Sequence, residues 1–279
     1  MVLGVAPLSA IRLPAVEFVR AAADAGFGQV GLRPLTVQET DGYCPTGVDA
    51  PDFDTLRGVL AETGMKVLDI EVCSATPALR REDWLGALGL GQALGARFLN
   101  IVGDDPDPDS LVRTVNAICA DAREHGIVPI LEPVAFRPLN DFDRAVRIAR
   151  DAGCRVELDV LHFQRTGASL QTVRDDPAMF PVVQLCDGPA RLDPADPELR
   201  ELAGSDDPHD VAIAEVRDRR LLPGEGGIPI PELLAALPDS EISVEIPHGP
   251  RQAARGDHAH LADLYRSASA YLSSLTPAH

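Results

Sequence analysis

Four short apolar runs in this chain each end on a side chain that carries an oxygen ligand. The runs at residues 128–132 and 155–159 end on Glu132 and Asp159, and two later runs reach Gln184 and Glu245. Carboxylate and amide oxygens suit Mg²⁺ or Mn²⁺, and they can also hold Co²⁺ or Zn²⁺. Four protein ligands leave room for two substrate oxygens, so the pattern predicts one divalent ion that bridges a carbonyl and a neighbouring hydroxyl.

Further polar residues follow the same kind of run or lie close to its end. His162 stands three residues after Asp159 and is expected to donate a hydrogen bond to Asp159 or to substrate. Arg217 and Arg219 precede residues 223–226, and one of them is expected to clamp an anionic or polyhydroxylated substrate. The residues predicted to bind substrate are Arg33, Glu71, Asn100, Arg219 and His248.

Each of these residues also has a purely structural interpretation. A carboxylate after a strand is often a helix N-cap or a solvated loop residue, and an isolated histidine or arginine is often a surface residue. Four oxygen ligands at the ends of four late strands make a common site the better hypothesis.

The elements that must position these residues repeat along the chain. Helices predicted at 15–25, 53–62, 82–94, 110–124 and 141–151 each end beside a glycine, at positions 26, 64, 95, 126 and 153. Glycine adopts the left-handed conformation that ends a helix. Apolar strands are predicted at 1–7, 29–33, 67–71, 98–102, 128–132 and 156–159, and they lack alternation, as in a parallel sheet buried on both faces.

A unit of this kind every 30 residues or so predicts a (β/α)8 TIM barrel that forms a single domain over residues 1–279. The alternative, an open doubly wound sheet, is disfavoured because no Gly-x-Gly-x-x-Gly follows the first strand. A short helix near 169–175, a strand at 182–186, a helix at 231–237, a strand at 242–246 and a helix at 258–275 complete the set. The Pro-, Asp- and Gly-rich segment 188–227 predicts a long loop after strand seven, where barrels place lids and active-site loops.

Composition excludes several partners. The net charge is −18 and the chain contains a single lysine, Lys66, which disfavours nucleic acid and anionic membrane surfaces. No apolar run has the length of a membrane span. The five cysteines show no paired spacing and are expected to be reduced core residues, so a cytoplasmic location is predicted.

The strand ends resemble those of the xylose isomerase-like TIM barrels, the sugar phosphate isomerase/epimerase group. The resemblance covers essentially the whole chain and is most specific at Leu131-Glu132-Pro, Leu158-Asp159, Val183-Gln184, Leu222-Pro-Gly-Glu-Gly226 and Val244-Glu245. It implies that Glu132, Asp159, Gln184 and Glu245 hold the metal. It also implies a small sugar or keto-polyol substrate, and members often form dimers or tetramers, so a homo-oligomer is compatible with it.

The chain departs from that family at two places. Most members have histidine at the position of Gln184, although some 3-dehydroshikimate dehydratases look similar there. Those dehydratases use a lysine near the strand-seven ligand, where this chain has Cys186. The three-zinc, histidine-rich site of endonuclease IV, another member, is absent.

The chemistry expected of such a site is proton transfer α to a carbonyl. Glu132 and Glu245 are predicted to act as general base and acid while remaining ligands, with His162 beside them. Return of the proton gives isomerisation or epimerisation, and loss of a β-leaving group gives dehydration or lyase chemistry. A non-catalytic sugar-binding barrel, or a subunit whose site is completed by a partner, is the alternative from another class.

Overall fold

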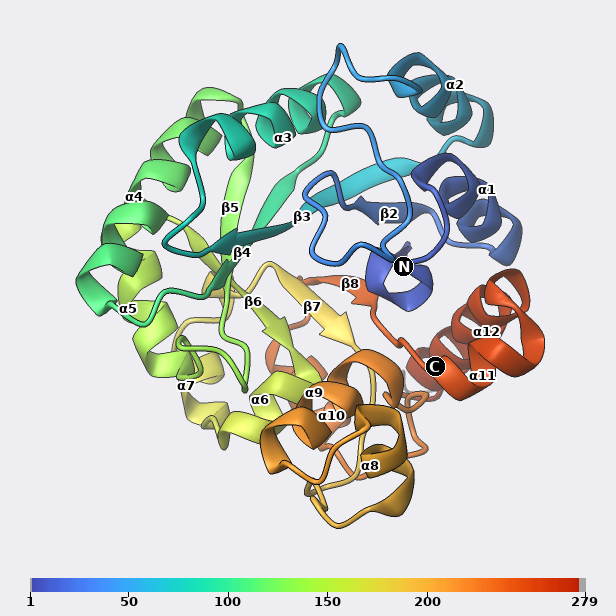
Figure 1. Ribbon diagram of the computed structural model, residues 1–279. Helices are drawn as coiled ribbons and strands as arrows, with labels where there is room; N and C mark the ends of the chain where they lie inside the picture. Colours follow the sequence, from blue (N-terminus) through green and yellow to red (C-terminus); the bar gives the residue numbers. More distant parts are fainter. Residues whose placement is uncertain (1, 276–279) are drawn as a thin grey trace.

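Eight parallel strands close into a barrel in the computed structural model, which describes residues 2–275 (Figure 1). Each strand pairs with the next, and the last pairs with the first through Leu3 with Ile242 and Val5 with Val244. The strands are β1 (Leu3–Val5), β2 (Gln29–Leu32), β3 (Lys66–Ala75), β4 (Phe98–Gly103), β5 (Val128–Glu132), β6 (Arg155–Asp159), β7 (Val182–Leu185) and β8 (Glu241–Val244). The predicted barrel is confirmed. Met1 of the predicted first strand, and residues 276–279, lie outside the described part of the chain.

Helices surround the barrel, as Figure 1 shows. The predicted ones form within two residues of their expected ends: α1 (Ala15–Ala25), α2 (Phe53–Thr63), α3 (Arg81–Leu94), α4 (Pro108–Glu124), α5 (Phe142–Ala152), α7 (Leu170–Asp175), α10 (Ile230–Ala236) and α12 (Asp257–Leu275). Gly26 and Gly153 have φ angles of 109° and 69°, the left-handed values that a helix end requires. Outside segment 188–227, the described chain also contains short helices that were not predicted: η1 (Pro7–Ala10), α6 (Val160–Thr166), α11 (Gly249–Arg255) and the 3-10 turn η2 (Pro177–Met179).

The segment after β7 is more ordered than its composition predicts. It contains α8 (Pro197–Ala203) and α9 (Pro208–Asp218), each opened by an aspartate that caps the helix and a proline at its first position. An Asp-Pro pair therefore marks a helix start here rather than a loop. Glu215 of α9 forms two hydrogen bonds with Arg165 of α6, at 2.6 and 2.8 Å, and this pair holds α9 against the barrel.

The core changes character along the barrel axis. The main apolar cluster lies between the sheet and the helices, and a second, separate cluster consists of Leu68, Phe98, Ile130 and Val182. Ile130 and Val182 stand two residues before Glu132 and Gln184 on the same strand face, so this second cluster lies beneath the polar end of the barrel. Within residues 2–275, no helix is long and apolar enough to span a membrane.

Candidate functional site

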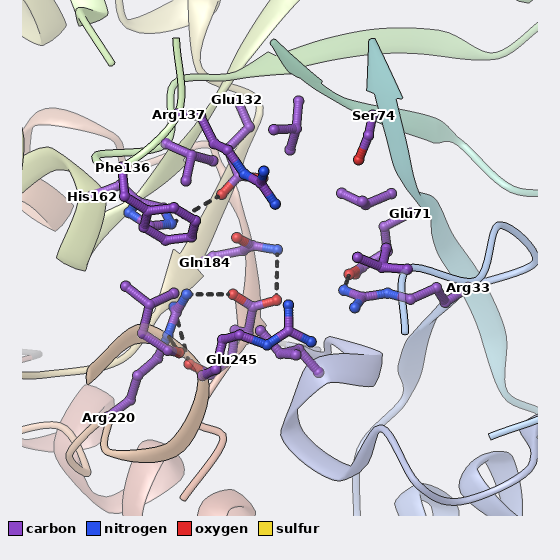
Figure 2. Close-up of a pocket in the computed structure, with 17 residues that line it drawn as sticks. Arg33, Glu71, Ser74, Glu132, Phe136, Arg137, His162, Gln184, Arg220 and Glu245 are labelled. Carbon is purple, nitrogen blue, oxygen red and sulfur yellow. Dashed lines mark hydrogen bonds and ion pairs between the residues drawn. The ribbon is translucent and has the colours of Figure 1, made fainter. Parts of the chain in front are cut away.

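The four predicted metal ligands meet at the carboxyl ends of the strands. Glu132 and Asp159 are the last residues of β5 and β6, and Glu245 directly follows β8. Asp159 pairs in register with Gln184 of β7, which pairs with Ser243 of β8. All four side chains are buried, and Glu132, Gln184 and Glu245 line one pocket (Figure 2).

A buried arginine stands among these ligands. Arg220 is 1% exposed, and its guanidinium forms ion pairs with Asp159 and, at 2.9 Å, with Oε2 of Glu245. Its Nε donates to the carbonyl of Val216 at 2.9 Å. Figure 2 shows Arg220 reaching Glu245 from the side of the segment that follows β7.

Sequence reasoning missed Arg220, although it considered Arg217 and Arg219 in the same run. The sequence alone does not distinguish these three neighbouring arginines. Arg220 is buried because the folded barrel brings its carboxylate partners together, and those partners are distant in the sequence. The one local signal is the apolar pair that follows, Leu221 and Leu222, which indicates an extended segment entering the protein.

Asp159 and His162 are locked together at the start of α6. The Oδ1 of Asp159 caps this helix by accepting the backbone N–H of His162 at 2.8 Å, so the capping role and the site role coexist. Nδ1 of His162 accepts from the backbone N–H of Ala135, which leaves the hydrogen on Nε2. That Nε2 faces Oε1 of Glu132 at 3.8 Å. Burial lowers the pKa of His162 to about 4, so the ring is neutral.

Glu132 is the carboxylate that Arg220 does not hold. Its Oε2 accepts from the side-chain amide of Asn100 at 2.9 Å, and the same amide nitrogen also donates to Glu157. Burial, together with the negative charges of Glu245 and Asp159, raises the pKa of Glu132 well above its ordinary value.

The other two carboxylates respond differently to the same burial. Burial raises the pKa of Glu245 to about 7, with Arg220 acting in the opposite direction. For Asp159, burial also acts to raise the pKa, but Arg220 and the hydrogen bond from His162 outweigh it and the pKa is lowered. The three buried acids therefore differ in how readily they carry a proton.

The residues fit a divalent ion. Ligand atoms of Glu132, Asp159 and His162 lie within 4.8 Å of one another, and the buried Oε1 of Gln184 has no hydrogen-bond partner within residues 2–275. Three carboxylates and one guanidinium leave two formal negative charges, which one divalent ion would balance. The four predicted ligands, Glu132, Asp159, Gln184 and Glu245, would hold it, although the group of close ligand atoms contains His162 and not Glu245.

Two residues predicted to bind substrate line the pocket, and three do not. Arg33 and Glu71 form an ion pair of 2.9 Å at its edge. Asn100 lies beneath the pocket with its amide on Glu132. Arg219 points away and pairs with Glu198 at 2.6 Å, and Nδ1 of His248 accepts the backbone N–H of Arg251 at the start of α11.

Other residues that the sequence did not single out also line the pocket, among them Ser74, Phe136 and Arg137. Arg217, at the last turn of α9, lines the pocket as well. Phe136 contacts the edge of His162, with ring centroids 5.9 Å apart.

Asp187, three residues after Gln184, has a structural role. Its carboxylate accepts the backbone N–H groups of Gly188, Gly224, Gly226 and Ile228 at 2.8 to 3.2 Å. Its backbone also pairs with Leu221, directly after Arg220. Asp187 therefore fixes the strand-like segment that carries Arg220 into the site.

Comparisons with known proteins agree with this architecture. No curated protein sequence matches the chain. Among solved structures, a xylose isomerase domain-containing protein from Salmonella typhimurium LT2 is 18% identical with a TM-score of 0.69, and the match covers 97% of both chains. D-Allulose 3-epimerase from Methylomonas sp. is 15% identical with a TM-score of 0.67, covering 99% of this chain and 98% of that one. A probable 3-DHS dehydratase from Bacillus anthracis is 12% identical with a TM-score of 0.69, covering 96% and 99%.

These identities are low, and the likeness therefore concerns the fold. The family model of the xylose isomerase-like TIM barrels matches residues 19–272. The chain belongs to the xylose isomerase-like TIM barrel family.

Proposed function

We propose that this protein is a divalent-metal-dependent enzyme that moves a proton α to the carbonyl of a small hydroxy-ketone, as an isomerase or epimerase. One observation carries the proposal: Glu132 and Glu245 face the same pocket from opposite sides of Gln184 (Figure 2). Two carboxyl groups on opposite sides of a bound substrate suit removal of a proton by one and its return by the other.

A divalent ion held by Glu132, Asp159, Gln184 and Glu245 would supply Lewis-acid chemistry at the carbonyl. Mn²⁺ or Mg²⁺ is favoured by the oxygen ligands, and Co²⁺ or Zn²⁺ is compatible with them. The unpartnered Oε1 of Gln184 supports this ligand set.

The chain's own residues divide the remaining work. In the described part of the chain, Glu132 forms no ion pair with arginine, and it is therefore the proposed base, which takes the proton from the carbon next to the carbonyl. Glu245, held by Arg220, is the proposed acid on the other side, and it returns a proton to the enediolate. Neutral His162 keeps its Nε2–H directed toward Glu132 and the substrate. Return to the other face gives an epimer, and return to the neighbouring carbon gives an isomer.

A second candidate uses the same first step. Loss of a β-hydroxyl from the enediolate would make the enzyme a dehydratase. The structural likeness to a probable 3-DHS dehydratase supports this second candidate. The D-allulose 3-epimerase structures favour the epimerase. A small molecule is the proposed partner in both cases, and the net charge of −18 opposes nucleic acid. The five free, buried cysteines support a cytoplasmic location.

Solvent-deuterium exchange tests the proposal. The protein is loaded with Mn²⁺, its metal content is measured, and keto-sugars, inososes and dehydroshikimate are incubated with it in D₂O and followed by NMR. We expect the wild-type protein to catalyse exchange at the carbon beside the carbonyl. Glu132→Gln should lose this exchange, and Arg219→Gln should retain it. A protein that stays metal-free after loading and exchanges none of the panel would instead be a non-catalytic binding barrel.

A further inference from the structure

Four arginines line the pocket or its floor, and three of them have a carboxylate partner. Arg220 is engaged by Asp159 and Glu245, Arg33 by Glu71, and Arg137 by Asp104 at 2.8 Å. Arg217 is different: among the described residues it forms neither a hydrogen bond nor an ion pair, although it lines the pocket and is half-buried. A partly buried guanidinium without an acceptor lacks the compensation that such groups ordinarily have.

The surroundings of Arg217 are themselves positive. Its pKa is lowered by burial and by the positive charges of Arg33 and Arg137, while the carboxylates of Asp41 and Asp218 act in the opposite direction without cancelling these effects. Three guanidinium groups thus line one pocket in a protein whose net charge is −18.

Two of these arginines are held in place by neighbouring side chains. Arg33 has a side chain only 8% exposed, and its buried Nε has no hydrogen-bond partner among the residues that the structure describes. Arg137 is fixed by Asp104 and by the ring of Phe136, whose centroid lies 5.3 Å from the guanidinium carbon. In Figure 2, Arg33 and Arg137 approach the middle of the pocket from two different sides. Donors held in this way lose little entropy when an anion binds.

We propose that Arg217, with Arg33 and Arg137, binds an anionic group on the substrate, so that the substrate is a hydroxy-ketone bearing a carboxylate or a phosphate. This inference rests on the proposed function and names its substrate class. Guanidinium groups match the oxygens of both anions in pairs. The single unpaired charge of Arg217 matches a carboxylate monoanion better than a phosphate dianion.

Matched probes that differ only in charge test the inference. Binding of shikimate is compared with that of its methyl ester, and binding of D-fructose 6-phosphate with that of D-fructose, by calorimetry with and without Mn²⁺. The expected result is that at least one charged probe binds about ten- to 100-fold more tightly than its neutral partner. The carboxylate pair is expected to show the larger ratio, and a larger ratio for the phosphate pair would assign the site to phosphate.

Arg217→Gln and Arg219→Gln form the matched pair of variants, since the second residue lies two positions away and outside the pocket. Arg217→Gln is expected to lose most of the charge preference, Arg217→Lys to keep part of it, and Arg219→Gln to keep it all. Thermal unfolding of each variant, followed by circular dichroism, shows that the fold is retained. Charged probes that bind no better than neutral ones at millimolar concentration, or a preference unchanged in Arg217→Gln, would overturn the inference.

Failure of this inference is distinct from failure of the proposed reaction. Charge preference without solvent exchange on any substrate would refute the proton-transfer chemistry and leave the anion site standing. Equal exchange with neutral and anionic ketones would refute the anion site alone.

Discussion

Arg220 and Asp159, 61 residues apart in the chain, form an ion pair that is buried at the floor of the pocket. The same guanidinium contacts Glu245, so one side chain supplies a permanent positive charge to two of the three acids in the site. Such a charge lets the acids converge before any metal ion arrives.

Replacing Arg220 with methionine is expected to destabilise the protein by about 3–5 kcal/mol, because two buried carboxylates lose their counter-charge. Urea unfolding at neutral pH measures the loss, with Arg219→Met as the control. Adding Mn²⁺ should restore more stability to the Arg220 variant than to wild type. If the variant fails to fold, combining it with Asp159→Asn should recover folded protein. Equal losses in the Arg220 and Arg219 variants would contradict the role given to Arg220.

Glu245→Gln is expected to reduce solvent exchange and turnover by about 10²- to 10⁴-fold, the usual contribution of a general acid or base, and to leave the fold intact. The exposed Glu225, which pairs with Arg251, provides the control variant Glu225→Gln. Metal content is measured on both proteins, so that a lost ligand is distinguished from a lost proton carrier. Unchanged activity in Glu245→Gln would remove this residue from the proposed mechanism.

Gln184 is expected to contribute to metal affinity through its unpartnered Oε1. Gln184→Leu should weaken Mn²⁺ binding by ~10–100-fold or more, and Gln184→His should shift preference toward Zn²⁺ and Co²⁺, since imidazole suits those ions. Competitive titration against a chelating dye measures both changes without any substrate. Equal Mn²⁺ affinity in wild type and Gln184→Leu would show that the amide is not a ligand.

The ionisation of Asp121 is expected to make the free energy of unfolding depend on pH in the acidic range. Its hydrogen bonds with Arg81, reinforced by one from Trp84 at 2.8 Å, lower its pKa to about 2 against the opposing effect of burial. Because the folded-state pKa lies below the ordinary value of 3.8, the contribution of Asp121 to stability is present above that pH and is lost as pH falls toward 2.

The test of Asp121 is Asp121→Asn, unfolded in urea over a range of pH. The variant should be less stable than wild type at neutral pH by about 1 kcal/mol, because a charge-assisted hydrogen bond becomes a neutral one. The difference should shrink as the solution becomes acidic. A difference that stays constant with pH would mean that Asp121 is not the titrating group.

Much of the fold could be predicted from the sequence because its signals are local. Glycines such as Gly26 and Gly153 end helices through their own backbone conformation, and apolar runs such as 128–132 indicate strands wherever they occur. The residue that closes such a strand reaches the mouth of the barrel, and Glu132 and Asp159 were therefore placed correctly at strand ends.

The remaining features depend on contacts between distant segments. Helix α9 docks against α6 through Glu215 and Arg165, and a composition rich in Pro, Asp and Gly hides both α8 and α9 in the sequence. Arg219 and Arg220 are neighbours in sequence, yet one pairs with Glu198 and the other is buried. Asn100 sits one layer beneath the pocket because of the register of β4, which no strand pattern reveals.

The carboxylate of Asp187 has a consequence for how this protein tolerates sequence change. It accepts the backbone N–H of Gly188, where segment 188–227 begins, and those of Gly224 and Ile228, where this segment ends. These hydrogen bonds close segment 188–227 at its base. Residues can therefore be added or removed between α8 and α9 without moving Arg220. Relatives that differ in the length of this segment are therefore expected to keep the same site. Replacing the part of the segment between Gly188 and Gly224 that does not carry Arg220 is a route to new substrates.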